Sequence, residues 1–295
     1  MDIATETYTY KVIDECEVKA DVYRAAGEGP RPVVVWIHGG ALIMGAREGA
    51  TGRAMRYVAA GYTVVSIDYR LAPETKAAGI VEDLCDAIRW VREDGPARFG
   101  IDSERLAVVG HSAGGYLTLM SGWCVDPPPT ALVAFYGYGD VVGQWYSRPS
   151  PFYCQQPVVS REQAYAAVGG PVIATSTGTD NRHRFYLYCR QQGIWPQEVV
   201  GHDPDTEPDA FTAFCPVRNV SSDYPPTLLL HGDRDTDVPH ELSVMMAREL
   251  GGAGVEHELI TIAGGEHGFD AAPEGRPQVE RALERVIQFL GQHLG

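Results

Sequence analysis

Short apolar runs alternate with amphipathic stretches along most of the 295 residues. Near the N-terminus, residues 7–12 and 17–24 alternate polar and apolar side chains with a period of two, which predicts an antiparallel pair of strands. Later runs are continuously apolar, as expected for strands that are buried on both faces of a parallel sheet. These runs are residues 33–37, 62–67, 106–109, 131–136, 227–230 and 258–262.

Between these runs, apolar residues recur at every third or fourth position, the spacing of a helix with one buried face. The pattern is plainest at residues 81–91 and 279–290. Regular alternation of strands and helices predicts an α/β fold with right-handed crossovers. We therefore expect a mostly parallel central sheet of about eight strands, flanked by helices on both faces.

The alternation breaks between residues 139 and 223, where Pro, Tyr and Trp are dense and no strand pattern is found. This segment is too long for a connecting loop, so it must have structure of its own. We expect helices at 161–168 and 181–192, and we interpret the segment as a helical cap inserted into a core of residues 1–138 and 224–295. The alternative is a run of the α/β core with poor periodicity.

Composition excludes several classes of partner. Lys and Arg number 24 against 39 Asp and Glu, a net charge of −15. A chain this acidic repels phosphate backbones and anionic lipid surfaces, so we expect no nucleic acid partner and no membrane-surface binding. No apolar stretch approaches the roughly 18 residues of a membrane span.

The first six residues have neither the basic nor the apolar region of a secretory signal. The six cysteines are scattered without a CxxC pair, which is typical of reduced thiols. We therefore expect a cytoplasmic protein that acts on a small-molecule substrate. A homodimer is compatible with the sequence.

The strongest chemical signal is the sequence Gly110-His111-Ser112-Ala113-Gly114. It has the G-x-S-x-G pattern and lies between an apolar strand and a helical stretch, the context that a nucleophile elbow requires. The tight turn needs nearly side-chain-free neighbours, and its strain projects the Ser112 hydroxyl above the sheet. The amide of Ala113, at a helix N-terminus, can then face an oxyanion.

A serine nucleophile needs a base, and His267 is the best candidate. It lies in a glycine-rich loop between the last predicted strand and the last helix. The acid that orients it is expected just after the preceding strand, where Asp235 is our first choice, Asp237 the second and Asp233 the third. The order Ser112, Asp235, His267 is that of the α/β-hydrolases.

The same acids have the D-x-D-x-D spacing of a calcium loop, but Val238 and Val244 replace its glycine and glutamate. We therefore expect no metal. Neither glycine-rich segment has the pattern of a phosphate cradle.

The remaining oxyanion donors are expected in the loop after residue 37, at Gly39, Gly40 and Ala41. Glycine allows the backbone to approach a substrate oxygen closely. His38 is expected to brace this loop through hydrogen bonds rather than to move protons.

These motifs together resemble the hormone-sensitive lipase branch of the α/β-hydrolases. The resemblance rests on His38-Gly39-Gly40-Ala41, Asp68-Tyr69-Arg70-Leu71-Ala72-Pro73-Glu74, Gly110-His111-Ser112-Ala113-Gly114-Gly115, His231-Gly232-x-x-Asp235 and Glu266-His267-Gly268-Phe269. It implies the α/β-hydrolase fold, a helical cap and cofactor-free ester hydrolysis, with Gly40 and Ala41 as oxyanion donors. Ala41 departs from the glycine of that family, and the N-terminal part is too short for its usual cap helices.

The sequence thus predicts a serine carboxylic-ester hydrolase for small-to-medium acyl or aryl substrates. Substrate-binding candidates are the aromatic residues of the inserted segment: Trp145, Tyr146, Tyr153, Tyr186 and Trp195. Amide or lactone cleavage by the same triad is the alternative, as in arylformamidases, lactonases or small peptidases. A non-catalytic ligand receptor on the same scaffold is a more remote alternative.

Overall fold

The computed structural model describes residues 3–27, 29–178 and 181–295. Residues 1 and 2, which belong to the stretch inspected for a secretory signal, lie outside the described residues. Within the described ranges, no helix combines the length and the apolar character needed to cross a bilayer.

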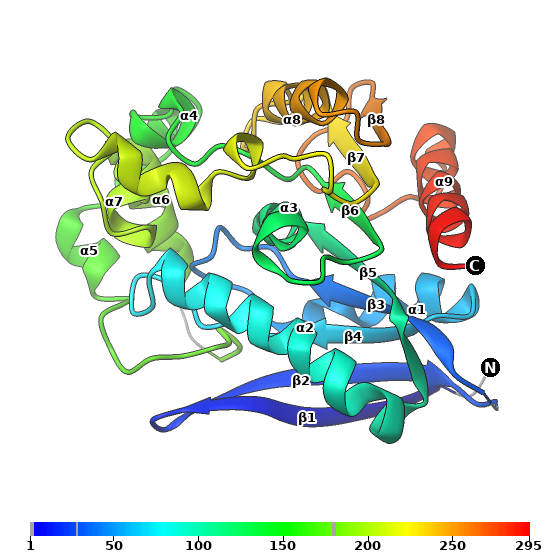
Figure 1. Ribbon diagram of the computed structural model, residues 1–295. Coiled ribbons are helices and arrows are strands. Elements are labelled where there is room, and N and C mark those ends of the chain that lie inside the picture. The colour runs from blue at the N-terminus through cyan, green and yellow to red at the C-terminus, as the bar shows by residue number, and fades with distance from the viewer. Residues whose placement is uncertain (1–2, 28, 179–180) are drawn as a thin grey trace.

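One eight-stranded sheet runs through the molecule in the order β1-β2-β4-β3-β5-β6-β7-β8 (Figure 1). The first two pairings are antiparallel and connect β1 (Ile3–Ile13), β2 (Cys16–Ala25) and β4 (Thr63–Ile67). The others are parallel and involve β3 (Arg31–Ile37), β5 (Ile101–His111), β6 (Ala131–Phe135), β7 (Thr227–Gly232) and β8 (His257–Ile262). The predicted α/β architecture with eight mostly parallel strands is confirmed.

Strand β5 begins at Ile101, earlier than the run at 106–109 predicted. Its first residues pair with the start of β3, and a register shift separates them from the buried part. The intervening polar residues hide this part of the strand from a search for apolar runs.

Burial on both faces explains the continuous apolar runs. In β3, Val33 and Ile37 join a hydrophobic cluster on one face of the sheet, whereas Val34 and Trp36 join a cluster on the opposite face. The first face is covered by α2 (Ala77–Phe99), α3 (Ala113–Cys124) and α8 (Glu241–Gly252), and the second by α1 (Thr51–Ala59) and α9 (Pro277–Leu294) (Figure 1).

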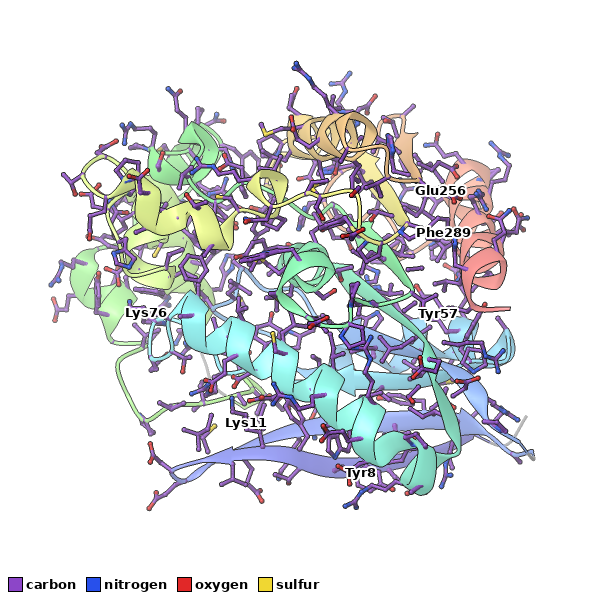
Figure 2. The ribbon with its side chains drawn as sticks, viewed as in Figure 1. Tyr8, Lys11, Tyr57, Lys76, Glu256 and Phe289 are labelled. Atoms are coloured by element: carbon purple, nitrogen blue, oxygen red, sulfur yellow. The ribbon has the colours of Figure 1, made fainter. Side chains whose placement is uncertain are left out.

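Side chains from distant helices meet on the second face. Tyr57 of α1 and Phe289 of α9, both labelled in Figure 2, are buried in the same cluster. At the antiparallel end of the sheet, Lys11 of β1 forms an ion pair with Asp83 of α2 at 2.8 Å. The helical patterns at 81–91 and 279–290 lie within α2 and α9.

Residues 139–223, here called the β6–β7 segment, connect the two strands after which they are named. Their described part contains helices and 3₁₀ turns but no strand. Its α-helices are α4 (Gln144–Ser147), α5 (Arg161–Tyr165), α6 (Arg182–Gln192) and α7 (Trp195–Val199). Helix α5 ends earlier than the range 161–168 predicted, whereas α6 closely matches 181–192.

Candidate active site

Ser112 occupies the turn between β5 and α3. Its backbone angles, φ 56° and ψ −117°, lie outside the usual regions for a residue with a side chain. A Cβ atom on Gly110 would lie 2.1 Å from the carbonyl oxygen of Gly114, and one on Gly114 would lie 2.1 Å from that of Ile37. Both glycines are therefore required by the turn that presents Ser112.

Three side chains that are distant in sequence form a hydrogen-bonded line at this turn. The Ser112 hydroxyl lies 3.0 Å from Nε2 of His267, which comes from the loop between β8 and α9. Nδ1 of His267 lies 2.7 Å from Oδ2 of Asp235, which follows β7. This is the arrangement in which a hydroxyl donates to a neutral imidazole whose other nitrogen donates to a carboxylate.

The Asp235 carboxylate is fully buried and well supplied with donors. Its Oδ1 accepts the backbone N–H groups of Asp237 and Val238, each at 2.9 Å, and His231 approaches Oδ2 at 3.3 Å. Burial alone would raise the pKa of Asp235, but the hydrogen bonds from His231 and His267 outweigh it and hold the pKa well below its usual range. Asp235 is therefore ionised at neutral pH.

The pKa of His267 is raised above its ordinary value. Burial and the charge of Arg190 lower this pKa. The hydrogen bond to Asp235 and the charges of Asp237 and Asp235 raise it by a larger amount. Asp237 lies on the other side of the ring from Asp235, with Oδ2 3.6 Å from Nε2. Asp233 instead accepts the backbone N–H of Gly264 at 2.6 Å.

The loop after β3 places Gly39, Gly40 and Ala41 beside the serine. A Cβ atom on Gly39 would lie 3.2 Å from Cβ of Ser112, and one on Gly40 would lie 2.0 Å from the carbonyl oxygen of Met44. Gly40 has φ 112°, and Ala41 adopts the left-handed region at φ 56°. The loop therefore requires glycine at position 40 and imposes strain at position 41.

The four predicted oxyanion donors all have free backbone N–H groups. In the described ranges, no hydrogen bond is found for the N–H groups of Gly39, Gly40, Ala41 and Ala113. Ala113 is the buried first residue of α3, where the initial N–H groups have no partner within the helix. These groups could donate to a negatively charged oxygen.

His38 supports this loop through its side chain. Nδ1 of His38 lies 2.7 Å from the carbonyl oxygen of Gly39, and its ring stacks on Tyr69 with a centroid distance of 4.3 Å. Burial lowers the pKa of His38 to about 4, although the hydrogen bond to Gly39 opposes this effect. The ring is neutral at pH 7 and braces the loop.

A cavity of about 430 Å³ opens over Ser112. Gly39, Gly40, Ala41 and His267 line it, whereas Ala113 does not. Of the five aromatic candidates, Tyr153 and Tyr186 lie on its wall.

Trp145, Tyr146 and Trp195 do not line this cavity. Tyr146 instead stacks between the two tryptophans, with centroid distances of 3.6 Å to Trp145 and 4.1 Å to Trp195. Tyr146 and Trp195 are almost completely buried. The structure places these three residues in the packing of the β6–β7 segment and not on the cavity wall, so their role as substrate-binding residues gains no support from it.

The same segment holds the loop after β3 in place. Nε1 of Trp195 donates to the carbonyl oxygen of Ala41 at 3.1 Å, and Nε of Arg182 donates to that of Ile43 at 2.6 Å. Arg182 also pairs with Glu74 at 2.7 Å, and both side chains are buried. Sequence analysis assigned no role to Arg182, and only the tertiary structure brings it to this loop.

Sequence analysis also missed a second buried carboxylate, that of Asp270. Asp270 accepts hydrogen bonds from the Tyr136 hydroxyl at 2.6 Å and from Nε of Arg53 at 2.8 Å, and Nε2 of His111 lies at 3.2 Å. Its environment holds the pKa of Asp270 well below the usual range: burial would raise it, but the charges and hydrogen bonds of His111 and Arg53 outweigh burial. Asp270 thus ties together the residue before Ser112, helix α1, the end of β6 and the histidine loop.

Tyr136 adds a direct contact with the candidate base. The ring centroids of Tyr136 and His267 are 4.6 Å apart. The backbone of Tyr136 has φ 37°, which is unusual for a residue with a side chain. A tyrosine that follows a buried strand, together with an acid three residues after His267, was the available sequence signal.

Other parts of the described chain offer no comparable arrangement. A larger cavity, of about 810 Å³, is lined by residues such as Ile3, Arg24 and Phe99 and contains none of the predicted site residues. Within the described residues, no group of three or more His, Cys, Asp or Glu side chains could hold a metal ion.

Two family models match separate parts of the chain. A model described as BD-FAE matches residues 20–128, which include Ser112 and the loop after β3. A model described as the prolyl oligopeptidase family matches residues 177–295, which include Asp235 and His267. Neither is a model of the hormone-sensitive lipase branch, so assignment to that branch stays a prediction.

Solved structures share the fold at low sequence identity. A protein of unknown function from Staphylococcus aureus superposes with a TM-score of 0.78 at 20% identity, covering 98% of this chain and 100% of that one. A propionate-bound esterase from Thermogutta terrifontis superposes with a TM-score of 0.69 at 22% identity, covering 98% and 94%. The superpositions show that the chain shares the fold of these proteins, and the two family matches indicate a hydrolase.

Curated relatives are much longer proteins. The non-reducing polyketide synthase adrD of Penicillium roqueforti is 29% identical over 341 aligned positions, which cover 98% of this chain. The chain spans 14% of the length of that relative.

Proposed function

We propose that this chain is a serine hydrolase that cleaves carboxylic esters of small-to-medium acyl or aryl substrates. The observation that carries the proposal is the line of Ser112, His267 and Asp235, with distances of 3.0 and 2.7 Å. An alcohol is a weak nucleophile unless a base accepts its proton, and the base works best when a carboxylate fixes its tautomer.

In the proposed first half-reaction, Oγ of Ser112 attacks the acyl carbonyl while Nε2 of His267 takes the hydroxyl proton. The N–H groups of Gly40, Ala41 and Ala113 donate to the oxyanion of the tetrahedral intermediate. The ester bond then breaks, and His267 gives its proton to the leaving alcohol. The acyl group remains on Ser112 as an ester.

In the second half-reaction, water takes the place of the serine hydroxyl. His267 accepts a proton from water as its oxygen attacks the acyl-enzyme, and then returns the proton to Oγ of Ser112. The products are a carboxylic acid and the regenerated enzyme. Asp235 stays ionised throughout and stabilises the imidazolium of His267.

The cavity supports a substrate of modest size. Its volume, about 430 Å³, lies in the lower half of the range for small-molecule sites, roughly 300–1,000 Å³. The propionate named for the Thermogutta esterase is a short acyl group. We further propose that the β6–β7 segment acts as the cap, because Tyr153 and Tyr186 reach the cavity from it.

Amide cleavage is the second candidate. It is favoured by the match to the prolyl oligopeptidase family over the part of the chain that contains Asp235 and His267. The proposed triad would serve either reaction, with His267 protonating an amine instead of an alcohol. A panel of aryl esters, lactones and anilides that share one acyl group separates the candidates. Because the adrD relative is named a polyketide synthase, the panel also includes esters of polyketide acids.

The test is the Ser112→Ala variant, with Ser222→Ala as a control at an exposed serine. Ser112→Ala should fold normally and lose at least about 10³-fold in turnover on a short-chain aryl ester, because no nucleophile remains. Ser222→Ala should retain full activity. Retention of activity by Ser112→Ala would refute the assignment of the nucleophile.

A further inference from the structure

Asp237 presents a rigidly held carboxylate to the cavity over Ser112. Its Oδ1 accepts a hydrogen bond from Arg190 at 2.6 Å and another from the Tyr186 hydroxyl. Arg190 also donates to the backbone carbonyl of Asp237 at 3.0 Å, and the Asp237 N–H donates to Asp235 at 2.9 Å. The carboxylate is therefore fixed from the segment above it and from its own loop.

The partner that holds it is itself deeply buried. The Arg190 side chain is only 3% exposed, and its guanidinium lies 4.7 Å from the ring centroid of Tyr153 and 4.9 Å from that of Tyr146. Among the described residues, its one ion pair is with Asp237. Burying an arginine is costly unless its charge is matched, and the Asp237 carboxylate is the group that pairs with it here.

One oxygen of the carboxylate retains acceptor capacity. The hydrogen bonds from Arg190 and Tyr186 both end on Oδ1, whereas Oδ2 lies 3.6 Å from Nε2 of His267. That distance is too long for a good hydrogen bond. The Asp237 side chain is 19% exposed, and the residue lines the cavity.

Oδ2 of Asp237 lies on the side of the site where the leaving group of the substrate is expected. In the proposed reaction, Nε2 of His267 delivers its proton to the leaving-group oxygen, so that oxygen comes within hydrogen-bond distance of Nε2. A donor one or two carbon atoms from this oxygen would then lie within reach of Oδ2 of Asp237. A carboxylate at the same place on the substrate would meet a like charge.

We propose that Asp237 is a specificity-determining residue that selects substrates whose leaving group carries a hydrogen-bond donor and disfavours leaving groups that carry a negative charge. This inference rests on the proposed hydrolase function. The glycine-rich loop after β3 lines another part of the same cavity. The expected substrates are esters of diols, polyols or amino alcohols.

The experiment uses three propionate esters: the propyl and 2-hydroxyethyl esters, whose leaving groups match in size, and the 2-carboxyethyl ester, whose leaving group carries a negative charge. Values of kcat/KM are measured on the pH plateau for the wild type and for Asp237→Asn. Asp205→Asn is the matched control, because Asp205 also pairs with an arginine of the segment, Arg148, but at the exposed surface.

The wild type should prefer the hydroxyethyl ester to the propyl ester by about tenfold and should cleave the carboxyethyl ester most slowly. Asp237→Asn should reduce the first preference severalfold and improve the relative rate on the carboxyethyl ester. Asp205→Asn should leave both ratios unchanged. An aminoethyl ester distinguishes a cationic from a neutral donor, and preference for either over the propyl ester supports the inference.

A substitution at position 237 leaves Arg190 without its partner and could destabilise the fold. The double variant Asp237→Asn/Arg190→Met removes both charges, and it should show the same loss of preference. Equal rates on the propyl and hydroxyethyl esters in the wild type would overturn the inference while the proposed hydrolase function stands. Equal ratios in the wild type and in Asp237→Asn would overturn it too, because a carboxylate that acts only through the pKa of His267 affects all esters alike. No cleavage of any ester would overturn both proposals.

Discussion

Replacement of Asp270 by asparagine should destabilise the protein strongly, although the change is isosteric. The carboxylate accepts from Tyr136 at 2.6 Å, from Arg53 at 2.8 Å and from His111 at 3.2 Å. An asparagine has one acceptor oxygen, and its amide N–H₂ would face a donor. At least one buried donor then loses its partner, and Arg53 loses its counter-charge.

The expected cost is about 3 kcal/mol in the free energy of unfolding. An unsatisfied buried donor costs about 1–3 kcal/mol, and breaking a buried ion pair from one side costs about 3–5 kcal/mol. The upper end does not apply, because the Arg53 side chain is 33% exposed and recovers hydration. Urea unfolding of the wild type and Asp270→Asn at pH 7 measures the difference.

The pH dependence gives a second, independent check. Because the pKa of Asp270 is depressed in the folded state, its stabilisation is fully present above the unfolded-state pKa of about 3.9 and is lost as pH falls toward the folded-state pKa. The difference between wild type and Asp270→Asn should therefore narrow by about 1 kcal/mol between pH 7 and pH 3. Turnover at pH 7 should also fall roughly tenfold, because small displacements at a reacting centre cost up to about 10²-fold.

Asp94→Asn is the matched control, since Asp94 pairs with Arg98 on the exposed surface of α2. It should change stability by less than about 0.5 kcal/mol. If Asp270→Asn were as stable and as active as Asp94→Asn, the reasoning about the buried carboxylate would be wrong.

Two further predictions concern the histidine and the loop after β3. The value of kcat/KM should rise with pH as His267 loses its proton, with a midpoint above the ordinary value of about 6.5, because the pKa of His267 is raised. The Asp237→Asn variant should have its midpoint at lower pH than the wild type. A midpoint below about 6 in the wild type would contradict the assignment of His267 as the base. Trp195→Phe removes the donor to the Ala41 carbonyl, so unfolding free energy should fall by about 1–2 kcal/mol and kcat severalfold with little change in KM. An unchanged kcat would show that this hydrogen bond does not position the loop.

The architecture could be predicted because short stretches of sequence determine which residues form the strands. Strands buried on both faces need an uninterrupted apolar run, and Val33–Ile37 shows one without any knowledge of its neighbours. Helix α1 was not predicted, because only Ala54, Tyr57 and Val58 of its residues are buried and Gly52 weakens the pattern. Local signals thus specify the sheet better than the short helices that cover it.

The site is partly local and partly not. The turn at Ser112 is predictable because Gly110 and Gly114 are sterically required by it. By contrast, Asp235 and Asp237 follow the same strand, and only the path of the loop decides that one meets Nδ1 of His267 and the other approaches Nε2. Two residues of separation in sequence become opposite sides of one ring.

The role of the aromatic residues could not be read from composition. Trp145, Tyr146 and Trp195 satisfy the need of the β6–β7 segment for a core, whereas Tyr153 and Tyr186 reach the cavity. Both uses require large apolar side chains, so a count of aromatics does not separate them. The distinction depends on which of these side chains face the cavity, a property of the tertiary structure.

The central claim is that Ser112 is a nucleophile activated by His267, and covalent labelling tests it most directly. A fluorophosphonate probe is incubated with the wild type, Ser112→Ala and His267→Gln, and the modified peptide is identified by mass spectrometry. The account predicts a single adduct on Ser112 in the wild type, none in Ser112→Ala, and labelling at least about 10²-fold slower in His267→Gln. An unlabelled Ser112 in the folded wild type, or equal labelling without the imidazole, would contradict it and favour a ligand receptor on a hydrolase scaffold.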